Sequence, residues 1–156
     1  SREQRALYDV VLEAQQAAID EVRTGQAFTA AHEAATRVIV AGLCALKLLT
    51  GGARSALKSG EYKRFFPHKT GHWIGLDVHD VGDYRVDDEP RMLEAGMVVT
   101  VEPGIYIPPD DAGVAARWRG IGIRIEDDVA VGARASEVLT AALPKDIAAV
   151  EALAVG

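Results

Sequence analysis

The stretch MVVTVEPGIYI, residues 97–107, carries the clearest strand pattern in the chain and holds one acidic residue inside it. Its side chains alternate between two faces, as in a β-strand. One face holds Val98, Thr100 and Glu102, and the other holds Met97, Val99 and Val101. Pro103 and Gly104 follow the acid, and they are expected to end regular strand pairing because proline has no N–H to donate.

A second stretch, GIGIRIEDDVAV at residues 120–131, has the same alternating pattern with acidic residues inside it. Ile121, Ile123 and Ile125 are expected on one face, with Arg124, Glu126 and Asp128 on the other. One interpretation is an antiparallel sheet with a solvated polar face. The other is a binding site, because an unpaired carboxylate buried in an apolar run would cost several kcal/mol and needs a cation or a metal.

The stretch HKTGHWIGLDVHD, residues 68–80, contains three of the four histidines of the chain. His68 and His72 have helical spacing, but Gly71 and Gly75 disfavour a helix, so a loop leading into a short strand is expected. Oxygen ligands joined by one imidazole suit Mn²⁺, Fe²⁺, Co²⁺ or Zn²⁺. The three stretches together therefore favour a metal-dependent hydrolytic site.

Composition bounds the class of protein. The 156 residues are 49% hydrophobic with a formal charge of −6, which suits one globular domain and disfavours nucleic acid or an anionic membrane as a partner. We find no apolar run of membrane-spanning length and no signal-peptide pattern. The single cysteine, Cys44, lies among apolar neighbours and is interpreted as a buried structural thiol, so we expect a cytoplasmic protein without disulfides.

The first third of the chain has helical periodicity. Ser1 and Gln4 predict a capped helix that runs to about Arg23, and a second helix is expected from Thr29 until Thr50-Gly51-Gly52. His32, in the first turn of the second helix, is interpreted as a solvent-facing residue. We expect a short helix or turn in SALKSGEYKRFF, and loops in DDEPRMLEAG and IPPDDAGVAARWRG.

The segments HKTGHWIGLDVHD, TVEPGIY and GIGIRIEDDV, in this order and at these separations, resemble the signature segments of the Xaa-Pro aminopeptidases. This family belongs to the superfamily of creatinase, prolidase and methionine aminopeptidase. The resemblance covers essentially the whole chain. It implies an α+β pita-bread fold, in which a curved antiparallel sheet carries helices on its outer face and two divalent ions, most often Mn²⁺, on its concave face.

The resemblance also implies roles for individual residues. His72, Glu102 and Glu126 are similar to metal ligands, with Glu126 as the bridging carboxylate. His79 is similar to the histidine that holds the scissile carbonyl, and Glu102 is the residue expected to move the proton of the attacking water. His68 and Arg124 are similar to groups of the proline-side pocket, although His68 could be a plain loop residue and Arg124 could simply pair with a carboxylate such as Asp128. Trp73 and Tyr106 receive no role, and Asp77 and Asp80 are expected to position His79 or to cap its loop.

One departure from the family pattern matters. The family supplies two further aspartate ligands from strands that precede the first helix, and residues 1–156 contain no equivalent, because Asp9 and Asp20 lie on a predicted helix. We therefore expect a partial catalytic domain that binds metal weakly and is inactive alone. An open sheet edge would favour self-association, or pairing with a companion fragment that carries the missing strands.

Three functions stay open at this level. The resemblance favours cleavage of the bond between an N-terminal residue and proline in peptides. A prolidase restricted to Xaa-Pro dipeptides would share the same motifs, and a module that binds peptides without catalysis is the alternative from another class.

Overall fold

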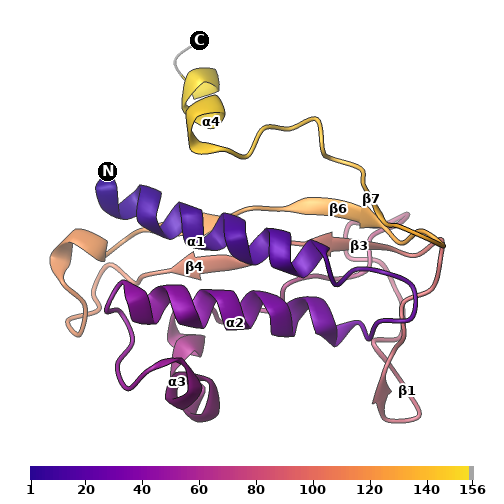
Figure 1. Ribbon diagram of the computed structural model, residues 1–156, viewed down its shortest axis with the longest axis horizontal. Helices are drawn as coiled ribbons and strands as arrows, with labels where there is room; N and C mark the ends of the chain where they lie inside the picture. The colour runs from indigo at the N-terminus through magenta and orange to yellow at the C-terminus, as the bar shows by residue number, and fades with distance from the viewer. Residues whose placement is uncertain (155–156) are drawn as a thin grey trace.

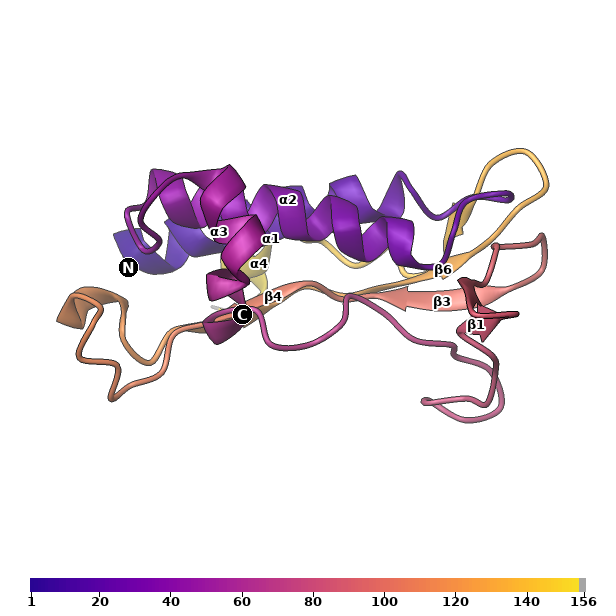
Figure 2. The same cartoon turned by 90° about the horizontal axis from the view of Figure 1, so that it is seen from below.

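In the computed structural model, which describes residues 1–154, two long antiparallel helices pack side by side across one face of a set of short strands (Figure 1). Figure 2 shows the helices on one side of the strands and the segment that follows α3 on the other side. This arrangement confirms the α+β prediction. The helices are α1 (Arg2–Ile19), α2 (Thr29–Ala45), α3 (Ala53–Ser59) and α4 (Ile147–Ala154), with 3₁₀ turns η1 (Glu61–Arg64) and η2 (Ala116–Trp118).

Helix α1 begins with the predicted capping box, in which the Ser1 hydroxyl accepts from the Gln4 N–H at 3.2 Å. It ends at Ile19, four residues before the predicted end, because the next residues form tighter turns with i→i+3 hydrogen bonds, which bury Val22 in the core. Where the helices cross, a Cβ on Gly42 of α2 would lie 2.5 Å from Val10 Cγ1 of α1, so glycine permits the close approach. Cys44 on the same helix is free and half-buried against the core, so it is less buried than predicted.

The strands within residues 1–154 form three small antiparallel sheets. They are β1 (Arg85–Val86), β2 (Glu89–Pro90), β3 (Val98–Val101), β4 (Gly104–Tyr106), β5 (Gly122–Arg124), β6 (Asp127–Ala130) and β7 (Glu137–Val138). The strand orders of the three sheets are β1-β2, β3-β6-β7 and β4-β5. The expected loop DDEPRMLEAG thus contains part of a hairpin, whose turn is made by Asp87 and Asp88 at positive φ.

The core lies between the helices and the strands. It is one cluster that joins the inward faces of α1 and α2 to β3 and β6, and it includes Leu7, Val11, Ile39, Leu43, Phe65, Val99, Val101 and Val129. No helix within residues 1–154 is long and apolar enough to cross a membrane. Because the helices bury one face of the strands, the polar groups on the opposite face are free to form a site.

Candidate functional site

The strand register places two glutamates opposite each other. Val101 pairs with Asp127 in one ladder, and Gly104 pairs with Arg124 in the next. These pairs continue a single register, so Glu102 lies across from Glu126 in the gap between the ladders. Pro103, which lacks an N–H, falls in the same gap and interrupts the pairing as predicted.

The segment 70–74 runs antiparallel along the free edge of β3 and brings an imidazole to these carboxylates. The Glu102 N–H donates to the Thr70 carbonyl at 2.6 Å, and the Thr100 N–H donates to the His72 carbonyl at 3.0 Å. A Cβ on Gly71 would lie 2.0 Å from the Thr100 carbonyl oxygen, so only glycine allows this approach. The predicted loop and short strand are therefore confirmed, with the strand reduced to a bridge between Trp73 and Val99.

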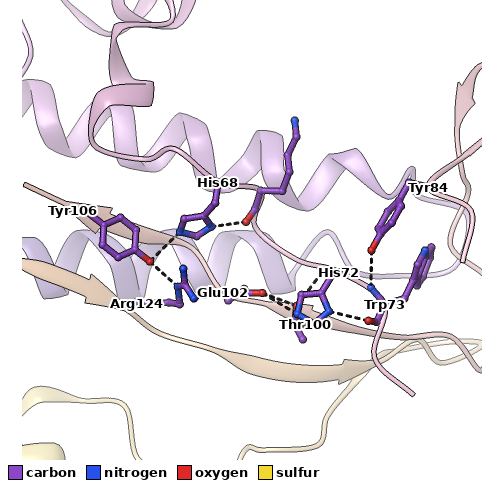
Figure 3. Close-up of polar contacts among 9 residues, drawn as sticks. His68, His72, Trp73, Tyr84, Thr100, Glu102, Tyr106 and Arg124 are labelled. Carbon is purple, nitrogen blue, oxygen red and sulfur yellow. Dashed lines mark hydrogen bonds and ion pairs between the residues drawn. The ribbon is translucent and has the colours of Figure 1, made fainter. Parts of the chain in front are cut away.

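His72 presents its Nε2 atom to Glu102 (Figure 3). Its Nδ1 lies 2.8 Å from the Trp73 carbonyl oxygen, which can only accept, so Nδ1 carries the hydrogen. In the neutral ring Nε2 then holds a lone pair, 3.2 Å from Glu102 Oε1. Two lone-pair atoms this close need a proton or a cation between them.

Glu126 completes a cluster that fits a divalent cation. One ligand atom from each of His72, Glu102 and Glu126 lies within 4.8 Å of the others. The pKa of the Glu126 carboxyl is raised, first by desolvation and then by the charges of Glu102 and Asp128, while His72 and Arg124 oppose this shift. A bound cation would relieve this repulsion, and one imidazole with two carboxylates is a donor set that such ions accept.

A second polar group continues the site along β4 and β5. The Arg124 guanidinium lies 3.4 Å from Glu102 Oε2 and donates to the Tyr106 hydroxyl at 2.6 Å, which lies 3.0 Å from His68 Nε2 (Figure 3). Arg124 therefore pairs with Glu102 and not with Asp128. The sequence motifs assign no role to Tyr106, although its even spacing from Glu102 along the strand places both side chains on one face.

His79 and His32 approach the site from two sides. The ring of His79, on an exposed loop, lies 4.2 Å from the His72 ring at nearly a right angle. Asp80 caps this loop by accepting from the Leu76 N–H at 3.0 Å, as expected. His32 is half-buried and its Nδ1 lies 2.9 Å from Thr70 Oγ1, so the interpretation as a solvent-facing residue is wrong. The spacing of His32 from Ala35, Thr36 and Ile39 places it on the buried face of α2, and this pattern could have predicted its burial.

Most of the polar side chains described above, but not Glu126 or Tyr106, border one pocket of about 630 Å³. Apolar side chains of Phe28, Leu93 and Val99 form part of its wall, and His32, His68, His72, His79, Glu102 and Arg124 supply polar groups. The pocket could accommodate a small peptide segment beside the cluster of ligand atoms.

The acidic residue next to Glu126 has a different environment. Asp127 is buried on the helix side of β6, where it accepts from Gln15 Nε2 at 2.7 Å and lies 2.8 Å from Lys145 Nζ. Sequence reasoning missed this residue, although Asp127 shares strand parity with Ile125 of the apolar face. It ties β6 to α1 and to the C-terminal segment, and so supports the strand that carries Glu126.

Several known proteins are similar to this chain in both sequence and fold. The sequence matches metallopeptidase family M24 over residues 1–133. The chain is 44% identical to the Xaa-Pro aminopeptidase of Haemophilus influenzae over 98% of its own length and 35% of that protein. Its structure matches aminopeptidase PepP of Pseudomonas aeruginosa with a TM-score of 0.96 and 55% identity, over 98% of this chain and 35% of that one. For Escherichia coli aminopeptidase P the TM-score is 0.93 at 42% identity, over 99% of this chain and 35% of that one.

The fold is therefore the α+β pita-bread fold of the aminopeptidase P structures. The chain belongs to metallopeptidase family M24. It spans about a third of the length of the Xaa-Pro aminopeptidases that it matches.

Proposed function

We propose that the complete protein containing this chain is a Xaa-Pro aminopeptidase, which hydrolyses the bond between an N-terminal residue and proline. The observation that carries this proposal is the convergence of His72, Glu102 and Glu126, with ligand atoms within 4.8 Å, in a chain 44% identical to an enzyme of that name. These three residues would hold divalent ions, with Glu126 shared between two of them. Such ions polarise a substrate carbonyl and make water acidic enough to react near neutral pH.

The other side chains would perform the proton and charge steps. The Glu102 carboxylate would accept a proton from the attacking water while the water oxygen bonds to the carbonyl carbon. The same carboxylate would then deliver the proton to the proline nitrogen as the C–N bond breaks. His79 would stabilise the negative charge that develops on the carbonyl oxygen.

His68 and Arg124 would line the subsite for proline. Support comes from the hydrogen-bonded row His68, Tyr106 and Arg124, which starts at the ligand cluster and runs along one side of it. The ring hydroxyl of Tyr106 holds both partners, so the shape of this wall is fixed before a substrate arrives.

We propose Mn²⁺ as the physiological ion, and two further aspartates from outside this chain as the remaining ligands. Three protein ligands with two negative charges suit hard divalent ions but leave them underliganded. One related structure is described as zinc-substituted Escherichia coli aminopeptidase P with product. Metal analysis of the complete protein as purified, beside activity with each ion restored, tests the choice of Mn²⁺.

We also propose that the exposed loop beside the site contacts another part of the complete protein or a second copy. Leu76, Val78 and Val81 protrude from this loop with most of their surface in solvent. An apolar patch of this kind is a common contact surface. Size-exclusion chromatography with light scattering tests the contact with a second copy, and amide hydrogen exchange of residues 76–81 in this chain and in the complete protein tests the internal contact. A monomeric complete protein in which these amides exchange as fast as in this chain would contradict the proposal.

The substrate class is tested by comparing three peptides with the complete protein and Mn²⁺. An Xaa-Pro-Xaa tripeptide should be cleaved after its first residue, and an Xaa-Ala-Xaa tripeptide should not. Cleavage of Xaa-Pro dipeptides alone would assign a prolidase instead. Binding of the tripeptide without any cleavage would assign a non-catalytic module.

A further inference from the structure

A hydrogen bond joins helix α2 to the segment that carries His72. His32 Nδ1 lies 2.9 Å from Thr70 Oγ1, and the Thr70 side chain is almost fully buried. Among the described residues this is the only side-chain hydrogen bond that Thr70 makes. The contact links residues 38 positions apart, from two different layers of the fold.

Thr70 is directly connected to two residues of the ligand cluster. Its carbonyl accepts the Glu102 N–H at 2.6 Å, and His72 follows it by two residues. Next to this contact, Thr100 Oγ1 donates to Glu102 Oε1 at 3.1 Å and accepts from the His72 N–H at 3.0 Å. A shift of Thr70 would therefore move His72 and Glu102 relative to each other.

The surroundings of His32 keep its ring in place and uncharged. Its ring packs on Phe66 at 5.4 Å, and Phe66 packs on His68 at 5.2 Å. Burial, followed by the charges of Lys69, His68 and Lys63, lowers the His32 pKa to about 4. A neutral imidazole can donate to the threonine hydroxyl or accept from it, whereas the charged ring could only donate.

We propose that His32 is a positioning residue of the metal centre, which acts through Thr70 to hold His72 and Glu102 at the separation that metal binding needs. The inference rests on the proposed metal site. His32 itself touches neither the ion nor the substrate in this role. It fixes the edge segment 70–72 against α2, so that the ligand atoms need little rearrangement when an ion arrives.

The test uses four single variants and one double variant of the complete protein, and it measures Co²⁺ affinity from the visible absorption of the bound ion. His32→Ala and Thr70→Val remove the hydrogen bond, whereas His32→Asn keeps a polar atom near the position of Nδ1 and Thr70→Ser keeps the hydroxyl. We expect affinity to fall on the order of 10-fold in the first two and to stay within about 3-fold of the parent in the second two. The double variant His32→Ala/Thr70→Val should lose no more than the worse single variant, because both remove the same contact.

A second measurement separates positioning from folding. Amide hydrogen exchange of the Glu102 N–H in the metal-free protein should quicken in Thr70→Val, which is nearly isosteric, while amides of the buried α1 face stay protected. Equal Co²⁺ affinity and equal exchange at Glu102 in all variants would overturn the proposal, even if His32→Ala lowered thermal stability. Neither measurement needs peptide cleavage, so an absence of Xaa-Pro hydrolysis by the parent would count against the proposed function alone.

Discussion

Replacing Lys145 by methionine should cause a large loss of stability, because it leaves a buried carboxylate without its cation. The Asp127 side chain is only 3% exposed and lies 2.8 Å from Lys145 Nζ. Removing one partner of a buried ion pair costs about 3–5 kcal/mol. Gln15 and Thr140 would still donate to Asp127, and Lys145 is itself partly exposed. We therefore expect Lys145→Met to lower the free energy of unfolding by about 3 kcal/mol, at the lower end of that range.

Urea unfolding followed by tryptophan fluorescence measures this loss, with Arg5→Met as the matched control. Arg5 pairs with Glu151 at 2.6 Å, but both side chains are more than half exposed. Breaking that pair should cost less than about 1 kcal/mol. The double variant Asp127→Asn/Lys145→Met should be more stable than Lys145→Met alone, since it removes both charges. Equal losses in Lys145→Met and Arg5→Met would refute the reasoning.

Three further predictions concern the site. Glu126→Gln should abolish most activity of the complete protein and release metal, whereas His79→Ala should keep the metal and chiefly lower kcat. Metal analysis beside kinetics compares the two variants, and loss of metal from His79→Ala would contradict the role of His79. Gly71→Ala should destabilise the fold by about 1–3 kcal/mol, because its methyl group would meet the Thr100 carbonyl oxygen at 2.0 Å. Gly75→Ala is the milder control in the same thermal melts, because the three atoms nearest to its methyl group all belong to the Asp80 side chain, which can move. Because folding lowers the His32 pKa from 6.5 to about 4, its contribution is present above pH 6.5 and is lost as pH falls towards 4. His32→Asn should therefore flatten the acid side of the stability curve by about 1–2 kcal/mol, allowing for solvent screening of the ring, and an unchanged curve would contradict this.

Local patterns predicted much of the fold. Ser1 and Gln4 marked the start of α1, and the alternation around Glu102 and Glu126 placed both acids on the face opposite the helices. These signals depend on residues close in sequence, where helical and strand periodicities act directly. The resemblance then associated His72 with the two glutamates, and the structure brings the three together.

Features that depend on distant partners were harder to predict. Asp127 is stabilised by Gln15 and Lys145, which lie far from it in sequence, and the residues next to Asp127 do not indicate these partners. His32 reaches the site only because α2 lies beside the segment 70–74. Strand β7 and helix α4 were not predicted either, since the segment after Val131 lacks a strong period of its own and is held by tertiary contacts such as the Arg5–Glu151 pair.

We propose above that His72, Glu102 and Glu126 hold the metal ions of a proline-specific aminopeptidase. Crystals of the complete protein grown with Mn²⁺, measured at the manganese absorption edge, test it most directly. We expect an anomalous peak within about 2.0–2.6 Å of His72 Nε2 or of the two carboxylates, with Glu126 near two peaks. An active protein whose manganese peaks lie away from all three side chains would contradict it.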